Sequence, residues 1–244
     1  MIDIHCHILP GFDDGAADLR EALAMAAMAA DSGVSAIVAT PHFRGTADSA
    51  AEEAATILRL FDELDEAIRA QRLPLTLHRG AEVLCLPETP ALAARGLLPT
   101  LAGTSYLLTE FYFDEPFDSM NERLEELATG GLVPVVAHPE RYAAIQRDPR
   151  LAAVWFAAGY VLQLNKGSVL GAFGSRVQQT AEHLLENGLA HLIASDAHGA
   201  DRRTPHMGAL FERLEELYDP EYVRILLTRN PRRLLDGRPM VPVE

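Results

Sequence analysis

The chain begins with Met1-Ile2-Asp3-Ile4-His5-Cys6-His7, a short apolar run that ends in two histidines. Similar runs recur along the sequence; each is short and rich in β-branched or aromatic residues, or is bounded by turn residues. This pattern predicts β-strands at residues 2–5, 35–40, 75–81, 106–110, 133–138, 160–165 and 191–195.

Helical periodicity fills the intervals between these strands. Helices are expected at residues 19–31, with Asp18 as the N-cap, and at 52–71, 119–129, 148–158, 176–187 and 205–218. The tail from Pro220 predicts one or two more, with a helix start at Asn230-Pro231. Strands that alternate with helices predict an α/β fold with a parallel sheet, either a closed barrel or an open doubly wound sheet. Because no repeat or low-complexity linker divides the sequence, residues 1–244 are expected to form a single domain.

The composition excludes several classes of function. The formal net charge of −14 argues against nucleic-acid binding, which needs clustered Lys and Arg. No signal peptide or membrane span is visible and two cysteines cannot build a disulfide framework, so a cytoplasmic protein is expected. The C-x5-R motif of cysteine-based phosphatases is excluded, because Phe12 and Ala91 stand where Cys6 and Cys85 would need an arginine.

Residues able to bind a metal follow nearly every predicted strand. They are His5, His7, His42, Glu82, Glu110, His138, Asp196 and His198. The loop after the first strand adds Asp14, whereas its neighbour Asp13 is interpreted as a turn residue. The carboxyl ends of barrel strands open on one face, so these residues are expected to converge there.

Side-chain alternation predicts which way the first strand faces. Residues two apart on a strand point the same way, so Asp3 and the two histidines are expected to face the barrel interior. Ile2, Ile4 and Cys6 would then face the helices, which makes Cys6 a packing residue.

The residue types indicate a metal centre. Imidazole and carboxylate groups together suit divalent first-row metals: oxygen ligands favour Mn²⁺ or Fe²⁺, and imidazole leaves Zn²⁺ as an option. Carboxylates at Asp14, Glu82, Glu110 and Asp196 would repel one another without cations. Two or three divalent ions would reverse this charge, attract a phosphate dianion and lower the pKa of a bridging water.

Arginines near the strand ends are candidates for phosphate binding. Arg141 and Arg203 lie just beyond ligand-bearing strand ends, where a guanidinium could hold phosphate oxygens in a bidentate manner. Arg44 and Lys166, the only lysine, are weaker candidates of the same kind. The alternative for each is an ordinary surface residue.

Together these motifs resemble a known family. They are Met1-Ile2-Asp3-Ile4-His5-Cys6-His7, Asp13-Asp14-Gly15, Thr40-Pro41-His42, Gly80-Ala81-Glu82, Glu110-Phe111, Ala137-His138-Pro139-Glu140-Arg141-Tyr142, Ala194-Ser195-Asp196-Ala197-His198 and Pro205-His206-Met207. From Met1 to about Asn230, the chain resembles the polymerase and histidinol phosphatase (PHP) family. Within it, the chain is most similar to the bacterial manganese-dependent protein-tyrosine phosphatases linked to capsule and exopolysaccharide synthesis.

The resemblance implies a distorted (β/α)7 TIM-like barrel and a single PHP-type metallophosphatase domain with a trinuclear centre. The expected metal is Mn²⁺, with Fe²⁺ or Zn²⁺ as alternatives. By this resemblance, His5, His7, Glu82 and Asp196 would hold one ion, Glu82, Glu110 and His138 a second, and Asp14, His42 and His198 a third. Arg141 and Arg203 match phosphate-binding positions, and His206 is either a proton donor or a structural residue. Lys166-Gly167 departs from the small polar residues expected after the sixth strand.

The function implied is a metal-dependent phosphomonoesterase that hydrolyses phosphotyrosine on proteins, by attack of a metal-bridging hydroxide and without a phosphoenzyme. The implied partner is the tyrosine-rich tail of a bacterial tyrosine kinase that regulates polysaccharide synthesis. Alternatives are a small-molecule phosphatase such as a histidinol phosphatase on the same centre, and a noncatalytic binding module. Amidohydrolases share the H-x-H strand, but many use a carboxylated lysine on the fourth strand, where this chain has Glu110.

Overall fold

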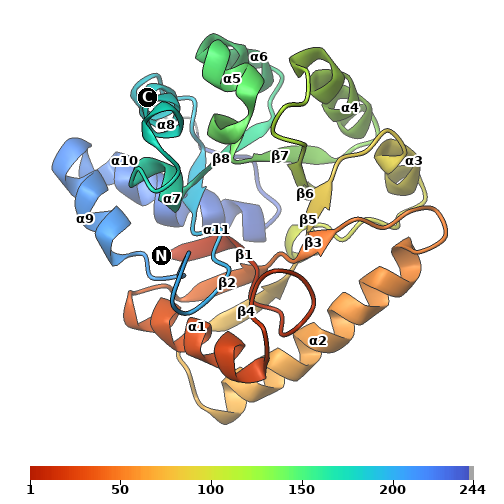
Figure 1. Ribbon diagram of the computed structural model, residues 1–244, viewed down its shortest axis with the longest axis vertical. Coiled ribbons are helices and arrows are strands. Elements are labelled where there is room, and N and C mark those ends of the chain that lie inside the picture. Colours follow the sequence, from red (N-terminus) through yellow and green to blue (C-terminus); the bar gives the residue numbers. More distant parts are fainter. Residues whose placement is uncertain (242–244) are drawn as a thin grey trace.

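The structure is a computed structural model that describes residues 1–241. The strands are β1 (Ile2–Cys6), β2 (Ala36–Ala39), β3 (His42–Phe43), β4 (Thr76–Arg79), β5 (Glu82–Leu84), β6 (Tyr106–Glu110), β7 (Val133–Ala137), β8 (Val161–Asn165) and β9 (Leu192–Ala194). The helices are α1 (Leu19–Asp31), α2 (Ala50–Ala70), α3 (Thr89–Ala94), α4 (Phe117–Thr129), α5 (Ala143–Arg147), α6 (Ala152–Ala157), α7 (Lys166–Val169), α8 (Ser175–Glu186), α9 (Gly208–Leu217), α10 (Pro220–Arg224) and α11 (Asn230–Leu235). A π-helical turn, Ile225–Arg229, joins α10 to α11. Figure 1 shows the strands at the centre with helices around them.

All strand pairs are parallel. One sheet has the order β1-β2-β4 and the other β3-β5-β6-β7-β8-β9. The barrel closes between β9 and β1, because the amide of Asp196 donates to the carbonyl of His5 at 2.9 Å and that of His7 donates to the carbonyl of Ala197 at 2.9 Å. The predicted distorted (β/α)7 barrel is confirmed, with β2/β3 and β4/β5 each acting as one interrupted strand.

The two interruptions correct the predicted strands 35–40 and 75–81. Pro41, which has no N–H to donate to a ladder, separates β2 from β3. Gly80 separates β4 from β5, and a Cβ there would lie 2.8 Å from Val38 Cγ1. His42 and Glu82 are therefore the first residues of short strands, and they pair with each other across β3 and β5.

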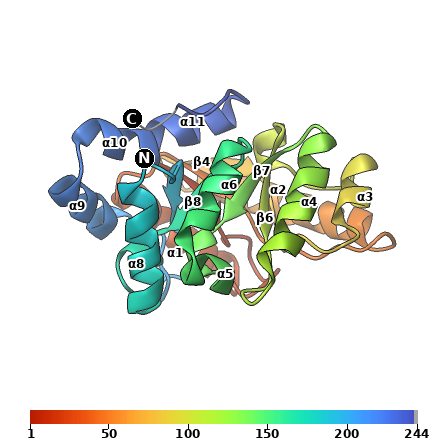
Figure 2. The ribbon, with the colours of Figure 1, turned by 90° about the horizontal axis from the view of Figure 1, so that it is seen from above.

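Two apolar clusters lie on the two faces of the strands. The interior cluster contains Ile2, Ile4, Ala36, Val38, Leu101, Tyr106, Leu108, Val135, Ala137, Val161, Leu192, Ala194 and Leu234. Leu234 belongs to α11, which covers one end of the barrel (Figure 2). The larger cluster, which includes Cys6 and the buried faces of α1, α2, α4 and α8, packs the helices against the outside of the strands. Because α11 covers one end of the barrel, we expect a functional site at the opposite end.

The predicted facing of β1 is wrong in part. Ile2 and Ile4 lie in the interior cluster, while Asp3 receives hydrogen bonds from the amides of Ser195 and His5. The cause is a register irregularity, since Asp3 pairs with Ile37 but Cys6 already pairs with Ala39. An extra residue in a strand changes the alternation, so sequence parity fails beyond it. Cys6 is fully buried in the outer cluster, as expected for a packing residue.

The helices differ from the prediction mainly at their ends and in short segments. Asp18 caps α1 by accepting a hydrogen bond from the amide of Glu21 at 2.8 Å, as predicted. The sequence did not reveal α3, α5 or α7, which are four to six residues long. The predicted helix 148–158 is a 3₁₀ turn, Pro149–Leu151, followed by α6. The predicted helix 205–218 begins only at Gly208.

Candidate active site

The predicted metal-binding side chains meet at one end of the barrel. A pocket of about 330 Å³ opens there, lined by Asp14, His42, Arg44, Glu82, Leu84, Glu110, Phe111, Tyr112, Phe113, His138, Arg141, Asp196, His198 and Arg203. These residues come from strand ends and the loops that follow them. The convergence expected from the strand-end pattern is therefore present in the structure.

His5 and His7 form the floor of the site. Both are fully buried, and their Nε2 atoms lie 3.2 Å apart. Glu82 Oε1 lies 3.3 Å from His5 Nε2 and Glu82 Oε2 lies 3.2 Å from His7 Nε2. Asp196 Oδ1 is 3.4 Å from His5 Nε2 and 3.5 Å from His7 Nε2. Two imidazole nitrogens and two carboxylates thus point at a common space.

Glu82 also contacts two further histidines of the site, His138 and His42. Its Oε1 is 2.9 Å from His138 Nε2, and its Oε2 is 3.2 Å from His42 Nδ1. His42 Nδ1 also lies 2.9 Å from Glu110 Oε1. Glu82 therefore lies within 3.3 Å of a nitrogen of four histidines.

Asp14 and His198 complete the outer side of the site. Asp14 Oδ1 lies 3.4 Å from His42 Nε2 and 3.5 Å from His198 Nε2. The Asp14 side chain is 67% exposed, so this side opens to solvent.

Asp13 is a site residue that the sequence interpretation missed. It does form the expected turn, since its Oδ1 accepts a hydrogen bond from the amide of Gly15 at 3.0 Å. In addition, His7 Nδ1 donates to Asp13 Oδ2 at 2.7 Å, and the amide of His42 donates to the same oxygen at 2.9 Å. Carboxylates that bind the second nitrogen of a metal-binding histidine are common, and this could have suggested Asp13.

Neighbouring carboxylates raise the pKa of two histidines of the site, His7 and His42. Burial disfavours the charged form of His7, but its hydrogen bonds to Asp13 and Glu82 outweigh burial and raise its pKa to about 9. Burial of His42 is likewise outweighed by Glu110 and Glu82, and its pKa rises to about 11. Positive charge is thus favoured in the middle of the carboxylate cluster.

The carboxylates respond in the opposite sense. Burial of Glu82 disfavours its charge, but His5 and the other imidazoles around it lower its pKa well below the usual range. Burial of Asp196 is outweighed mainly by His5, which lowers its pKa to about 2. His198 differs, because burial and the neighbouring charge of His7 lower its pKa to about 4. A neutral imidazole is the form that binds metals.

The donor set fits divalent cations. Within residues 1–241, three sets of side chains could each hold an ion: His7, Asp14, His42 and His198; His5, His7 and Asp196; and His42, Glu82 and Glu110. In each set, every residue offers one ligand atom, and these atoms all lie within 4.8 Å of one another. The close approach of His5 Nε2 to His7 Nε2 brings two lone pairs together unless a proton or a cation lies between them. Mixed nitrogen and oxygen donors of this kind suit Mn²⁺, Fe²⁺ or Zn²⁺.

Arg141 and Arg203 face this cluster from the rim. Arg203 Nη2 donates to Asp196 Oδ2 at 2.5 Å, and Arg141 Nη1 lies 3.5 Å from the same oxygen. The backbone is left-handed at His138 (φ 38°), Asp196 (φ 48°) and Arg203 (φ 49°). Non-glycine residues rarely adopt this conformation, and it clusters at functional sites.

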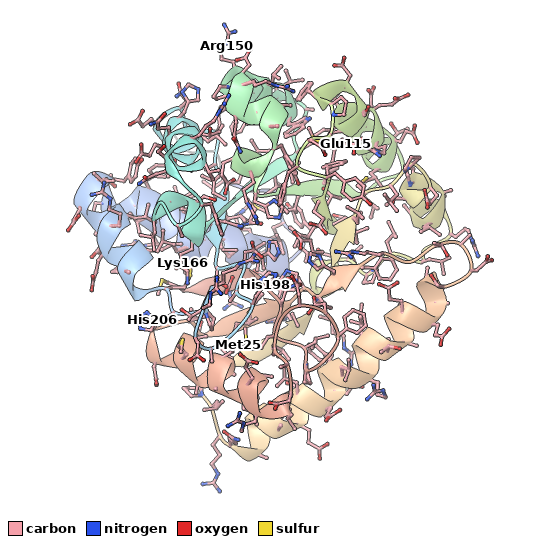
Figure 3. All side chains as sticks on the ribbon, in the orientation of Figure 1. Met25, Glu115, Arg150, Lys166, His198 and His206 are labelled. Atoms are coloured by element: carbon pink, nitrogen blue, oxygen red, sulfur yellow. The ribbon has the colours of Figure 1, made fainter. Side chains whose placement is uncertain are left out.

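Of the remaining predicted residues, His206 and Lys166 lie outside the pocket lining, whereas Arg44 is part of it. His206 is exposed and does not line the pocket; its Nδ1 accepts a hydrogen bond from the amide of Gly208 at 3.2 Å. Lys166 is buried, and its Nζ donates to the carbonyls of Thr204 and His206. Figure 3 shows both residues to one side of His198. Arg44 is exposed and lines the pocket.

Comparison with known proteins identifies the family. The family described as "Capsular polysaccharide synthesis, CpsB/CapC" matches residues 1–236. The chain belongs to the CpsB/CapC family. It is 34% identical to the tyrosine-protein phosphatase YwqE of Bacillus subtilis over 96% of this chain and 91% of the relative. It is 29% identical to the tyrosine-protein phosphatase CpsB of Streptococcus pneumoniae over 96% of this chain and 98% of the relative.

The fold of the present chain is similar to that of a solved structure from this family. That structure comes from crystal structures of YwqE from Bacillus subtilis and CpsB from Streptococcus pneumoniae, which are described as unique metal-dependent tyrosine phosphatases. The TM-score is 0.89, with 34% identity and coverage of 100% of both chains. The predicted relation to metal-dependent tyrosine phosphatases of capsule synthesis is therefore confirmed at the level of family and fold.

Proposed function

We propose that this protein is a metal-dependent phosphomonoesterase that hydrolyses phosphotyrosine on proteins. The observation that carries the proposal is the position of two arginines, Arg141 and Arg203, on the rim of a pocket whose floor is a cluster of imidazoles and carboxylates. The named activity of the relatives YwqE and CpsB supports the same reaction.

The cluster would hold two or three divalent ions, with Mn²⁺ as the expected metal. Its proposed ligands are His5, His7, Asp14, His42, Glu82, Glu110, His138, Asp196 and His198. Bound there, the ions would supply Lewis acidity and a water of lowered pKa as the nucleophile.

The chain's own residues would bind and orient the phosphate. The guanidinium groups of Arg141 and Arg203 carry parallel N–H donors suited to two phosphate oxygens. Both now point at Asp196, and a phosphoryl group in the pocket would be a second anionic acceptor within their reach. Charge on the equatorial oxygens would be stabilised by donors that are already in place.

The leaving group of the substrate determines how much the reaction depends on a general acid. A tyrosine phenol has a pKa of about 10, so a phenolate leaves more readily than an alkoxide. His206 is exposed and outside the pocket-lining set, so the proposed reaction assigns it no proton transfer.

The rim of the pocket favours an aromatic substrate. Tyr112 and Phe113 are neighbours that line the pocket, and they are 56% and 46% exposed, so both rings are accessible from it. An aromatic ring of the substrate could pack against them. A small phosphate ester such as histidinol phosphate would leave this surface uncovered, which makes a histidinol phosphatase the second candidate.

The proposed biological partner is the phosphorylated, tyrosine-rich tail of a bacterial tyrosine kinase that regulates polysaccharide synthesis. The family name, capsular polysaccharide synthesis, supports this pathway. No helix within residues 1–241 has the length and apolar character needed to span a membrane. We propose a cytoplasmic location and a single catalytic domain.

Phosphate release tests the proposal. Protein treated with a chelator is assayed on a phosphotyrosine peptide and on histidinol phosphate, side by side, with and without added Mn²⁺. The expected result is peptide turnover that returns only with the metal. Preference for histidinol phosphate would overturn the substrate, and no turnover of either compound by metal-loaded protein would overturn the phosphatase assignment.

A further inference from the structure

Phe173 contacts both arginines of the proposed phosphate pocket. Its ring lies 4.5 Å from the Arg141 guanidinium carbon and 5.8 Å from that of Arg203. Phe113 also contacts Arg141, with its ring centroid 4.4 Å from the same carbon. Arg141 therefore contacts two aromatic rings, and one of these, Phe173, also contacts Arg203.

These contacts join distant parts of the sequence. Phe173 lies in the loop between α7 and α8, Phe113 follows β6, and Arg141 follows β7. Cation–π contacts of this kind restrain a guanidinium without using its N–H donors. These ring contacts therefore restrain Arg141 and leave its N–H donors for anions, which at present include Asp196.

Gly167 makes room for the Phe173 ring. A Cβ on Gly167 would lie 2.7 Å from Phe173 Cε2 and 2.9 Å from Cζ, closer than real Cβ contacts allow. The ring would have to move away from α7, and that movement would disturb its contacts with the arginines. This accounts for glycine at the position where the sequence departs from the family resemblance.

We propose that Gly167 and Phe173 act as one unit that positions Arg141 and Arg203 for the phosphoryl group of the substrate. This inference rests on the proposed function, because it takes the two arginines as phosphate ligands. Phe173 is a positioning residue: its contacts are to the arginines, and its effect on the reaction passes through them.

Steady-state kinetics on a phosphotyrosine peptide with Mn²⁺, together with the inhibition constant of inorganic phosphate, test this proposal. Phe173→Ala and Phe173→Leu are expected to raise KM and the inhibition constant roughly five- to tenfold, the scale of losing a cation–π contact, with a smaller change in kcat. Phe173→Tyr keeps the ring and is expected to retain wild-type values. Phe211→Ala, which removes a ring on α9 that is 36% exposed, is the matched control.

The glycine supplies a second, independent test. Alanine has the higher helix propensity, so Gly167→Ala is not expected to destabilise α7 by that route, yet it should raise KM as Phe173→Ala does. In the double variant with Phe173→Ala, the added methyl group meets no ring and should cost nothing further. Additive losses in the double variant would overturn the coupling.

The arginine variants distinguish a failure of the Phe173 positioning role from a failure of the proposed phosphate pocket. If Arg141→Ala and Arg203→Ala weaken phosphate inhibition but Phe173→Ala and Phe173→Leu leave it unchanged, the positioning role is wrong and the phosphate pocket stands. If the arginine variants also leave phosphate inhibition unchanged, the phosphate pocket and the positioning role are both wrong.

Discussion

His7 Nδ1 donates a hydrogen bond to Asp13 Oδ2 at 2.7 Å, and this contact orients a histidine on the floor of the site from outside the proposed ligand set. The same carboxylate oxygen accepts a hydrogen bond from the amide of His42, so Asp13 links His7, which follows β1, to His42, the first residue of β3. His7 is held with its Nε2 toward Glu82 and Asp196.

Asp13→Ala is therefore expected to weaken metal binding while leaving the barrel folded. Loss of a carboxylate that orients a metal-binding histidine lowers metal affinity about 10- to 100-fold. Isothermal titration calorimetry, in which Mn²⁺ is added to protein freed of metal by a chelator, measures this affinity. Asp18→Ala, which removes the α1 cap, is the control and should leave the affinity unchanged. Wild-type affinity in Asp13→Ala would contradict the role.

The sequence predicted which residues meet, because the rule that joins them is simple. Parallel strands share one direction, so a metal-binding residue after each strand reaches the same face wherever it lies in the chain. His5, Glu110, His138 and Asp196 were placed by this rule alone, and the structure brings them together.

What the sequence could not predict depends on local backbone geometry and on contacts between distant loops. The irregularity in β1 reverses the facing of Ile2 and Ile4, and hydrophobic pattern does not reveal an extra residue in a strand. The packing of Phe173 on Arg141 joins two loops whose spacing in the sequence carries no signal. Lys166, a candidate for phosphate, instead bonds the backbone of a neighbouring loop.

Glu82→Gln should remove more metal than any other single carboxylate substitution. Glu82 lies within 3.3 Å of His5, His7, His42 and His138, so its charge is shared across the whole centre. We expect the loss of at least one bound ion and a fall in kcat of roughly a thousandfold, because metal-assisted attack is the main source of rate. The protein is loaded with Mn²⁺ and passed through a gel-filtration column, and elemental analysis then measures the number of ions bound per chain. Glu63→Gln, in an exposed pair with Arg59, is the control.

Metal removal should lower the stability of the folded protein. Buried Glu82 and Asp196 are stabilised by positive neighbours, and divalent ions would add to this stabilisation. Ligand binding to the folded state alone contributes about 2.7 kcal/mol when the free ion is at about 100 times its Kd. Thermal unfolding with a chelator and with Mn²⁺ measures the difference. An equal midpoint in both conditions would count against a metal centre.

Protonation of His191 is expected to lower the free energy of unfolding in acid. Burial lowers its pKa to about 4, and its Nδ1 accepts a hydrogen bond from the amide of Leu162 at 3.1 Å. Between about pH 6.5 and about pH 4 the unfolded chain binds a proton that the folded chain does not, so stability falls as the pH falls through this window. The effect is about 2 kcal/mol between about pH 7.5 and about pH 5. Urea unfolding of the chelated protein at both pH values should show a smaller difference for His191→Gln than for the wild type. His183→Gln on α8 should keep the wild-type difference.

Lys166→Met is expected to loosen the loop that carries Asp196, His198 and Arg203. Lys166 Nζ donates to the carbonyl of His206 at 3.0 Å and to that of Thr204, the residue after Arg203. Methionine keeps much of the apolar stem but leaves both carbonyls without this donor, at a cost of about 1–3 kcal/mol. Urea unfolding of the chelated protein measures this cost in the absence of metal effects. Arg59→Met on the exposed face of α2 is the control for losing a positive charge. If Lys166→Met unfolds at the wild-type urea concentration, the buried lysine does not hold this loop. The left-handed backbone at Arg203 would then be maintained by other contacts. One such contact is the hydrogen bond that the amide of His198 donates to the carbonyl of Arg203 at 2.9 Å.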